Sequence, residues 1–449
     1  MSQLGLRPSR ALVSARRRRL PPVDNALVLL AGALIIWGPP AIRRATADRP
    51  LSAALDSPLS LDPAALLQVA SWLLAAVLAG FWLVRHLGRG TLPLDSLLSE
   101  RPVRWYLLFG LMAVASAAYS ASPLYTLYFA LRIFVGMAVL ALIAWHGGPD
   151  GARRLLSLAF LVFGLQTVAI SVLFLIDPTL VGGIDGGVRF RLTGGVLSDY
   201  GASALIVGLY FLTLLLFGST RRQRIVGTAG YIASWGLIVA SATRSTMASG
   251  LLFLVIMALA HPRLRNKVAL LGLIAVVALL GLVPAFGQSV FGVLTRQGEG
   301  LEDLSGRTVA FTYLLDQWQS SPVVGYGFGA GTRAALIPFV EQTGLGIGAG
   351  HDMLSTVLVD LGAVGALILL IALISAWRGM LLLYRSVPLS SPSRILLHQL
   401  ICLLAWITLS GLVDPGIAGG SVRFEVVLVT MWALRTFEPD RSSSARLNV

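Results

Sequence analysis

Long apolar runs recur along almost the whole sequence and limit the folds that this chain can adopt. Twelve such runs can be counted, most of them roughly 17 to 25 residues long, the length of a helix that crosses a hydrocarbon core. Charged residues make up only 12% of the chain, about half the share found in a soluble protein. We therefore predict an all-α polytopic membrane protein with about twelve transmembrane helices. The predicted spans are 25–42, 64–84, 104–120, 124–146, 154–176, 198–218, 225–243, 246–261, 267–286, 352–377, 394–412 and 424–437.

The net charge of +14 is explained by membrane topology and does not require a nucleic-acid partner. With a cytoplasmic N-terminus, 24 of the 35 basic residues lie on the cytoplasmic side, which the positive-inside rule favours. The first span follows Arg16 to Arg19, and we expect it to be retained because Gly38-Pro39-Pro40 offers no signal-peptide cleavage pattern. The other 11 basic residues lie outside or within a span: Arg43, Arg44, Arg49, Arg132, Arg189, Arg191, Arg244, Arg296, Arg307, Arg333 and Arg423.

This topology predicts the organisation of the whole chain. Residues 1–24 form a disordered, basic cytoplasmic N-terminus, residues 25–437 a single transmembrane domain, and residues 438–449 a cytoplasmic tail. A large periplasmic loop, 287–350, interrupts the domain. Within this loop we expect one amphipathic helix on the membrane surface, starting near Ser305. Its apolar residues at helical spacing are Val309, Ala310, Tyr313, Leu314 and Trp318.

His351 is the one histidine of five that this topology places on the outer face. It precedes a long apolar helix, so its imidazole can reach both water and the membrane interface. Histidine is the side chain best suited to general acid–base chemistry near neutral pH. A helix-capping or interfacial role is the alternative.

Several arginines on the outer face form a second candidate group. Arg189 and Arg191 flank Phe190, Arg244 stands at a short turn between two spans, and Arg307 begins the predicted surface helix. Guanidinium groups bind phosphate oxygens in bidentate fashion, so such a group suits a diphosphate. Arginines that extend to lipid headgroups are the alternative.

Two charged residues, Arg132 and Asp360, fall inside predicted spans and are candidates for either function or helix packing. The glycine-rich run 325–331 does not follow a strand, so it is not a nucleotide loop. We interpret it as a packing loop in which Tyr326 and Phe328 could stack on sugars. Metal-binding spacings such as HExxH or CxxC are absent from the sequence.

The chain resembles the O-antigen ligase and polymerase superfamily of bacterial membrane proteins that assemble glycans. The resemblance covers roughly residues 185 to 370. The motifs that carry it are Arg191-Leu192-Thr193-Gly194-Gly195, Ser198-Asp199-Tyr200, Ala242-Thr243-Arg244-Ser245, Ser305-Gly306-Arg307-Thr308, Ser321-Pro322-Val323-Val324-Gly325-Tyr326-Gly327, and His351 followed by Gly362-Ala363-Val364-Gly365.

Three positions depart from the usual pattern of this superfamily. Asp352 stands where asparagine commonly follows the histidine, and Ser198-Asp199-Tyr200 stands where Asp-Pro-Asn is common. Thr243-Arg244 replaces the usual serine–arginine pair. The departures concern the subfamily more than the superfamily.

The resemblance implies a GT-C-like, all-helical glycosyltransferase in the bacterial inner membrane, with its active site facing the periplasm. The implied donor is a glycan on undecaprenyl diphosphate, and neither a nucleotide sugar, a cofactor nor a metal is needed. The implied catalytic residues are His351, Arg307 and Arg191. The implied substrate-binding residues are Arg244, Arg189, Asp199, Tyr326 and Asp352.

The acceptor is less defined than the donor. We favour a repeat-unit polymerase, because the Ser-Gly-Arg-Thr and Gly-Tyr-Gly-Phe-Gly-Ala strings are similar to those of exopolysaccharide polymerases. A ligase that uses lipid A core and a protein O-oligosaccharyltransferase are alternatives. A transporter of lipid-linked glycan is the alternative from another class. A flippase and a chain-length regulator would be partners of the enzyme, besides the inner-membrane lipids.

Overall fold

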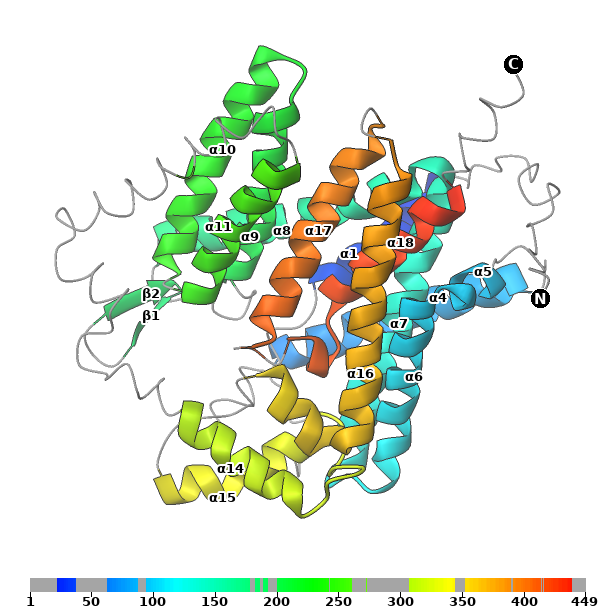
Figure 1. Cartoon of the computed structure of the whole chain (residues 1–449), viewed down its shortest axis with the longest axis vertical. Helices are drawn as coiled ribbons and strands as arrows, with labels where there is room; N and C mark the ends of the chain where they lie inside the picture. The colour runs from blue at the N-terminus through cyan, green and yellow to red at the C-terminus, as the bar shows by residue number, and fades with distance from the viewer. Residues whose placement is uncertain are drawn as a thin grey trace.

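In the part of the chain that the structure describes, the protein is a bundle of helices with one short two-stranded ribbon at its edge (Figure 1). The computed structural model describes residues 22–37, 63–87, 94–177, 182–185, 189–192, 200–241, 243–260, 272, 307–343, 352–388, 391–412, 414 and 416–437. Its elements are α1 (Pro22–Trp37), α4 (Pro63–Leu87), α5 (Leu94–Ser99), α6 (Arg101–Ala115), η2 (Ser116–Ala118), α7 (Pro123–Gly147), η3 (Gly148–Asp150), α8 (Gly151–Ile176), β1 (Gly182–Asp185), β2 (Arg189–Leu192), α9 (Tyr200–Phe217), α10 (Arg221–Ala240), α11 (Arg244–Ala260), α14 (Arg307–Gln319), α15 (Gly331–Thr343), α16 (Met353–Ser386), α17 (Ser393–Ser410), η6 (Gly416–Gly419) and α18 (Val422–Phe437).

The prediction of a helical membrane protein is confirmed. Eleven of the twelve predicted spans coincide with helices in the described part of the chain; the span 267–286 lies outside it, apart from Gly272. Four helical segments among the described residues are long and apolar enough to cross a membrane. These are Pro123–Ile176, which contains α7 and α8, then Tyr200–Phe217, Met353–Ser386 and Ser393–Ser410. Shorter apolar helices are Ala26–Trp37, Val69–Trp82 and Ser245–Ala260.

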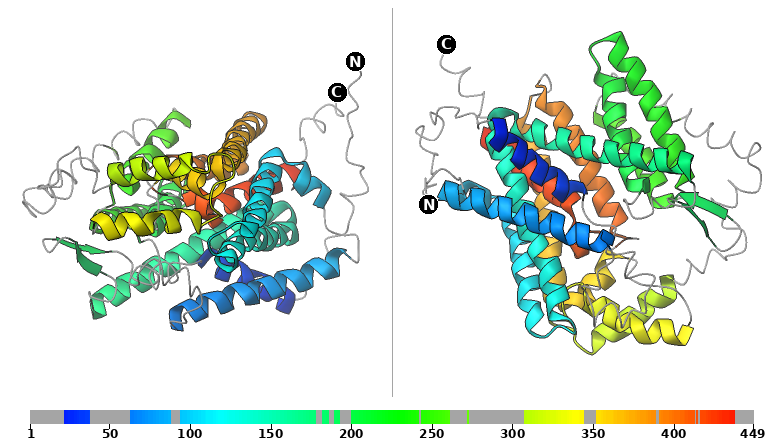
Figure 2. Two further views of the ribbon diagram at one scale, coloured as in Figure 1. Left: turned by 90° about the horizontal axis from the view of Figure 1, so that it is seen from below. Right: turned by 180° about the vertical axis from the view of Figure 1, so that it is seen from behind.

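The last helix, α18, lies in the core of the bundle. Every residue from Phe424 to Leu434 is buried, and the helix packs against α7, α8 and α17. Figure 2 shows these helices from two further sides. The Tyr106 hydroxyl donates to the Glu425 carboxylate at 3.3 Å, which joins α6 to α18. A helix held on several sides in this way gives the residues at its start, including Arg423, a fixed position.

Arg132 serves packing in this structure. Its guanidinium lies 4.5 Å from the centre of the Trp72 ring and 5.2 Å from that of Phe129. Its charge also interacts with Glu425 of α18. The side chain is only 8% exposed, so this buried cation connects α4, α7 and α18.

The helix α16 is interrupted at Gly362, where its backbone has φ +65° and ψ −170°. The interruption frees peptide groups that pair with the motif before α15. Tyr326 and Gly327 donate their amides to the carbonyls of Val359 and Asp360, at 2.9 and 2.8 Å. In return Ala363 donates to the Pro322 carbonyl at 2.8 Å. The Ser321-to-Gly327 motif is therefore held against α16 by backbone hydrogen bonds around the interruption.

Asp360 holds the start of α15. Its carboxylate is 1% exposed and accepts the amides of Gly329 and Thr332 at 2.8 and 2.7 Å, as well as the Thr332 hydroxyl at 2.8 Å. A carboxylate at a helix N-terminus is favourable because it meets unsatisfied amides and the positive end of the helix dipole. Of the two roles considered for Asp360, the structure supports packing.

Replacing Asp360 by alanine is expected to destabilise this region by about 2–4 kcal/mol, since the cap is lost and buried donors are left without an acceptor. Hydrogen exchange of the Gly329 and Thr332 amides should rise strongly. Asp316→Ala on the exposed face of α14 is the control and should leave this exchange unchanged. Equal exchange in the Asp360 variant and the wild type would show that the cap is dispensable.

Two features of the outer segments differ from the sequence predictions. The loop 287–350 contains a second helix, α15, which the sequence did not suggest because Pro338 lies inside it. Leu336 and Phe339 of α15 pack with Ala310 and Leu314 of α14 and with Val359 of α16. The loop before α9 contains the antiparallel ribbon β1–β2, in which Gly183 pairs with Arg191 and Asp185 with Arg189.

Candidate functional site

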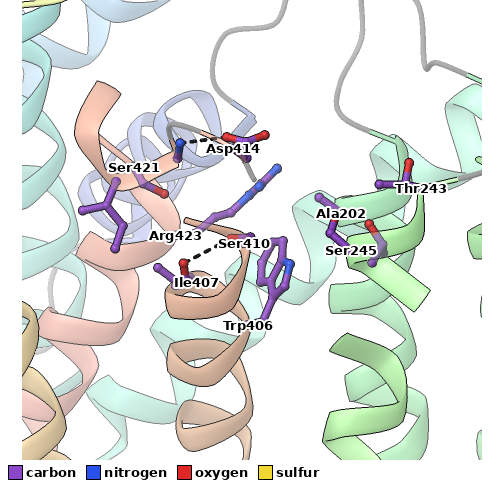
Figure 3. Close-up of a pocket in the computed structure, with 12 residues that line it drawn as sticks. Ala202, Thr243, Ser245, Trp406, Ile407, Ser410, Asp414, Ser421 and Arg423 are labelled. Atoms are coloured by element: carbon purple, nitrogen blue, oxygen red, sulfur yellow. Dashed lines mark hydrogen bonds between the residues drawn. The ribbon is translucent and has the colours of Figure 1, made fainter. Parts of the chain in front are cut away.

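A cavity of about 60 Å³ lies where the ends of four helices meet, α9, α11, α17 and α18. These are the ends that the sequence places on the periplasmic side. Among the described residues, hydroxyl groups from several elements line it together with one cation and one carboxylate (Figure 3). The lining residues are Ala202, Thr243, Ser245, Thr246, Trp406, Ile407, Ser410, Asp414, Gly416, Ile417, Ser421 and Arg423.

One wall of the cavity depends on a close approach of α9 to the turn between α10 and α11. A Cβ atom on Gly201 would lie 2.8 Å from the Ser241 hydroxyl oxygen and 3.2 Å from those of Thr243 and Thr246. Only glycine allows this approach without displacing the hydroxyls. Two of the motifs, the one ending at Tyr200 and the one around Thr243, thus lie side by side.

Arg423 is the cation among the described residues that line the cavity. It lies in the first turn of α18, with its guanidinium carbon 4.9 Å from the centre of the Trp406 ring and 5.9 Å from that of Phe163. In Figure 3 its side chain lies beside Asp414 and Trp406, across the cavity from Thr243 and Ser245. Stacking on Trp406 orients the guanidinium plane, and a stacked guanidinium keeps its N–H donors at its edge.

The start of α16 adjoins the same cavity. The amide of Met353 donates to the Gly411 carbonyl at 2.7 Å, one residue after the cavity residue Ser410. Asp352 caps α16, since its carboxylate accepts the Ser355 amide at 2.7 Å and also a hydrogen bond from the Ser355 hydroxyl. Asparagine is an equally good cap. The departure at Asp352 from the common asparagine therefore keeps the local structure.

The other predicted site residues are placed only in part. Arg189 and Arg191 lie on β2, Arg244 begins α11 and Arg307 begins α14. The side chains of these four arginines are outside the described part of the structure, as are the residues His351 and Asp199. Their participation in a site stays a prediction.

The two aromatic residues of the glycine-rich run have different environments. The Tyr326 hydroxyl donates to the Gln317 carbonyl at 3.1 Å, and its ring is half-buried against the α14–α15 cluster. Phe328 is fully buried and packs edge-on against Phe109 at 5.8 Å between ring centres. The suggestion that Phe328 stacks on sugars is wrong, because its ring is part of the core.

Sequence reasoning counted Arg423 among the outer basic residues but did not assign it to a site. It also missed the hydroxyls of Thr246, Ser410 and Ser421, which are ordinary residues at helix ends. One signal was present in the sequence. Arg423 lies near the N-terminus of a helix that is predicted to begin on the outer face. Neither the positive-inside rule nor the helix dipole favours an arginine there, so its position requires another explanation.

The fold and this cavity define the protein as a helical membrane protein with a polar site at one end of its bundle. A family model described as O-antigen ligase matches residues 229–370, from within α10 to beyond the interruption of α16. A search of curated proteins finds no match. The family match supports the resemblance to the O-antigen ligase and polymerase superfamily over residues 229–370 of the chain.

Proposed function

We propose that the protein transfers glycan from undecaprenyl diphosphate to an acceptor hydroxyl at the periplasmic face of the bacterial inner membrane. The reaction is metal-independent and inverts the anomeric centre. The match of residues 229–370 to the O-antigen ligase family carries this proposal. We also propose that the chain has twelve spans in a GT-C-like arrangement, with both termini in the cytoplasm.

The distribution of arginines supports this sidedness. Arg101 and Arg221 begin α6 and α10 at the opposite end from the cavity, where a cytoplasmic location accounts for them. Arg423 lines the cavity and Arg244 lies between the lining residues Thr243 and Ser245, each in the first turn of a helix. Arg307 is in the first turn of α14, which packs against α16. There the helix dipole disfavours a cation, and a bound diphosphate would offset this cost.

His351 is the proposed general base. It immediately precedes Asp352, which caps α16 beside the cavity. The imidazole accepts the proton of the acceptor hydroxyl. At the same time the oxygen of this hydroxyl attacks the anomeric carbon from the face opposite the diphosphate. The bond between the anomeric carbon and the phosphate oxygen breaks, and its electron pair leaves with the diphosphate.

The arginines stabilise the leaving group in this mechanism. Arg191 and Arg307, with Arg244, bind the diphosphate and balance the negative charge that grows on it. The remaining proposed substrate contacts are Arg189, Asp199, Tyr326 and Asp352. Because the Tyr326 hydroxyl donates a hydrogen bond to the Gln317 carbonyl, the exposed part of the Tyr326 ring is the surface available to a sugar.

We propose a repeat-unit polymerase as the particular activity, in which the acceptor is a sugar on a second lipid-linked unit. The motif strings around Arg307 and Tyr326 favour it. The description of the matched family favours the second candidate, a ligase that uses lipid A core. A flippase and a chain-length regulator are proposed partners.

Product analysis of the purified protein in lipid nanodiscs tests this proposal. The protein is given an undecaprenyl-diphosphate repeat unit, either alone or with lipid A core. Long products without core are expected for the polymerase, whereas a single transfer that needs core would select the ligase. Intact donor under both conditions would contradict a glycosyltransferase function.

A further inference from the structure

The cavity between α9, α11, α17 and α18 has the composition of an anion-binding site. Thr243, Ser245 and Thr246 line one wall, and Ser410 and Ser421 line others. The hydroxyls of Thr243 and Ser410 donate to the carbonyls of Ser241 and Ile407, so Ser245, Thr246 and Ser421 are the donors considered for a ligand. Hydroxyls can donate to phosphate oxygens as well as accept, unlike carboxylates. A cavity whose described lining combines hydroxyls with an arginine therefore matches a phosphate group better than a neutral sugar.

The position of Arg423 is constrained before any ligand binds. The buried part of α18 that follows it fixes its backbone, and the Trp406 ring 4.9 Å away orients its guanidinium. Both constraints reduce the entropy that is lost when the side chain binds an anion. The amides in the first turn of α18 add a positive potential at the same place.

We propose that this cavity binds a phosphate group of a lipid-borne anion through Arg423, with the facing hydroxyls of α11 as further donors. On the proposed function, this group belongs to the diphosphate of the glycan donor. Arg423 joins the helix α18 to donor recognition and is a binding residue that lies beyond residues 229–370, the segment matched by the family model.

Asp414 also lines the cavity and distinguishes an anion site from a structural ion pair. Its carboxylate accepts the Gly416 amide at 2.7 Å, so one oxygen is engaged within its own loop. Asparagine at this position would keep that hydrogen bond and remove the charge. An anion site predicts tighter phosphate binding after Asp414→Asn, whereas a structural pair with Arg423 predicts weaker binding.

The test measures binding of pyrophosphate and of a short-chain isoprenyl diphosphate to the full-length protein in nanodiscs with neutral lipid. Arg423→Gln should weaken binding about 10- to 100-fold, since hydrogen bonds to a charged group are lost. Arg85→Gln is the matched control, because Arg85 is also stacked on a tryptophan, 5.4 Å from the Trp82 ring. Ser245→Ala, which leaves α18 unchanged, should weaken binding severalfold.

Each outcome bears on the proposal. Nanodiscs that contain phosphatidylglycerol distinguish a lipid headgroup from the donor diphosphate as the source of the bound phosphate. If phosphatidylglycerol competes for the cavity and the diphosphate probes do not, the bound phosphate is that of a headgroup. Unchanged binding in Arg423→Gln, or weaker binding in Asp414→Asn, would overturn the site. Turnover is measured in parallel. Normal turnover and donor KM in Arg423→Gln would refute this inference alone, and absent turnover in the wild type with Arg423-dependent binding would refute the proposed function alone.

Discussion

His351→Ala is expected to slow the release of undecaprenyl diphosphate about 10²- to 10⁴-fold, the usual effect of losing a general base. The acceptor hydroxyl would then have to lose its proton without a positioned imidazole. Donor binding should change little, because the proposed diphosphate contacts are arginines. The measurement is single-turnover release with saturating donor.

His86→Ala is the control for this experiment, since His86 lies near the end of α4 that is predicted to face the cytoplasm. It should release undecaprenyl diphosphate at the wild-type rate. The thermal stability of both variants is measured to show that they are folded. Wild-type turnover in His351→Ala would remove this residue from the mechanism.

Gly362→Ala is expected to destabilise the protein by about 2–5 kcal/mol, because a strained backbone and a steric clash combine. A Cβ atom at this position would lie 2.2 Å from the Val323 carbonyl carbon. The φ of +65° is also one that residues with side chains rarely adopt. The melting temperature in detergent and the fraction of monodisperse protein report the loss.

Two other glycines separate the causes of this effect. Gly148 has φ +54° but open space where a Cβ atom would lie, so Gly148→Ala should show the cost of backbone strain alone, about 1–3 kcal/mol. Gly236 is helical and also has open space, so Gly236→Ala should be neutral or stabilising by up to about 1 kcal/mol. Equal melting temperatures for all three variants would show that the contact between the Ser321-to-Gly327 motif and α16 contributes little to stability.

Much of the helical architecture could be predicted from the sequence because its signal is local. An apolar run of sufficient length specifies a helix wherever it lies, and eleven predicted spans coincide with helices. The start of α14 at Arg307 was also close to the predicted start. Its residues Ala310 and Leu314 are buried, as their spacing indicated, although Val309 is exposed.

The parts that sequence reasoning missed depend on contacts between distant segments. α15 contains a proline, and its N-terminus is stabilised by Asp360, which lies 28 residues after Thr332. Gly362 stood out in the sequence as part of a motif, yet in the structure it allows the backbone of Val323 to approach α16 closely. No local pattern reveals such a partner.

The cavity illustrates the same limit. Arg244 was singled out because it occupies a short turn between two spans. Arg423 was not, because its surroundings come from Trp406 of α17 and from the turn before α11. These segments are far apart in the chain, and their proximity requires the assembled bundle.

Donor cleavage in sealed proteoliposomes tests the central claim most directly. Undecaprenyl-diphosphate glycan is incorporated, a metal chelator is present on both sides, and free undecaprenyl diphosphate and the transbilayer position of the donor are followed together. We expect free undecaprenyl diphosphate to accumulate with transferred glycan in the wild type and not in His351→Ala. Movement of intact donor across the bilayer without release of undecaprenyl diphosphate would contradict a transferase and indicate a transporter.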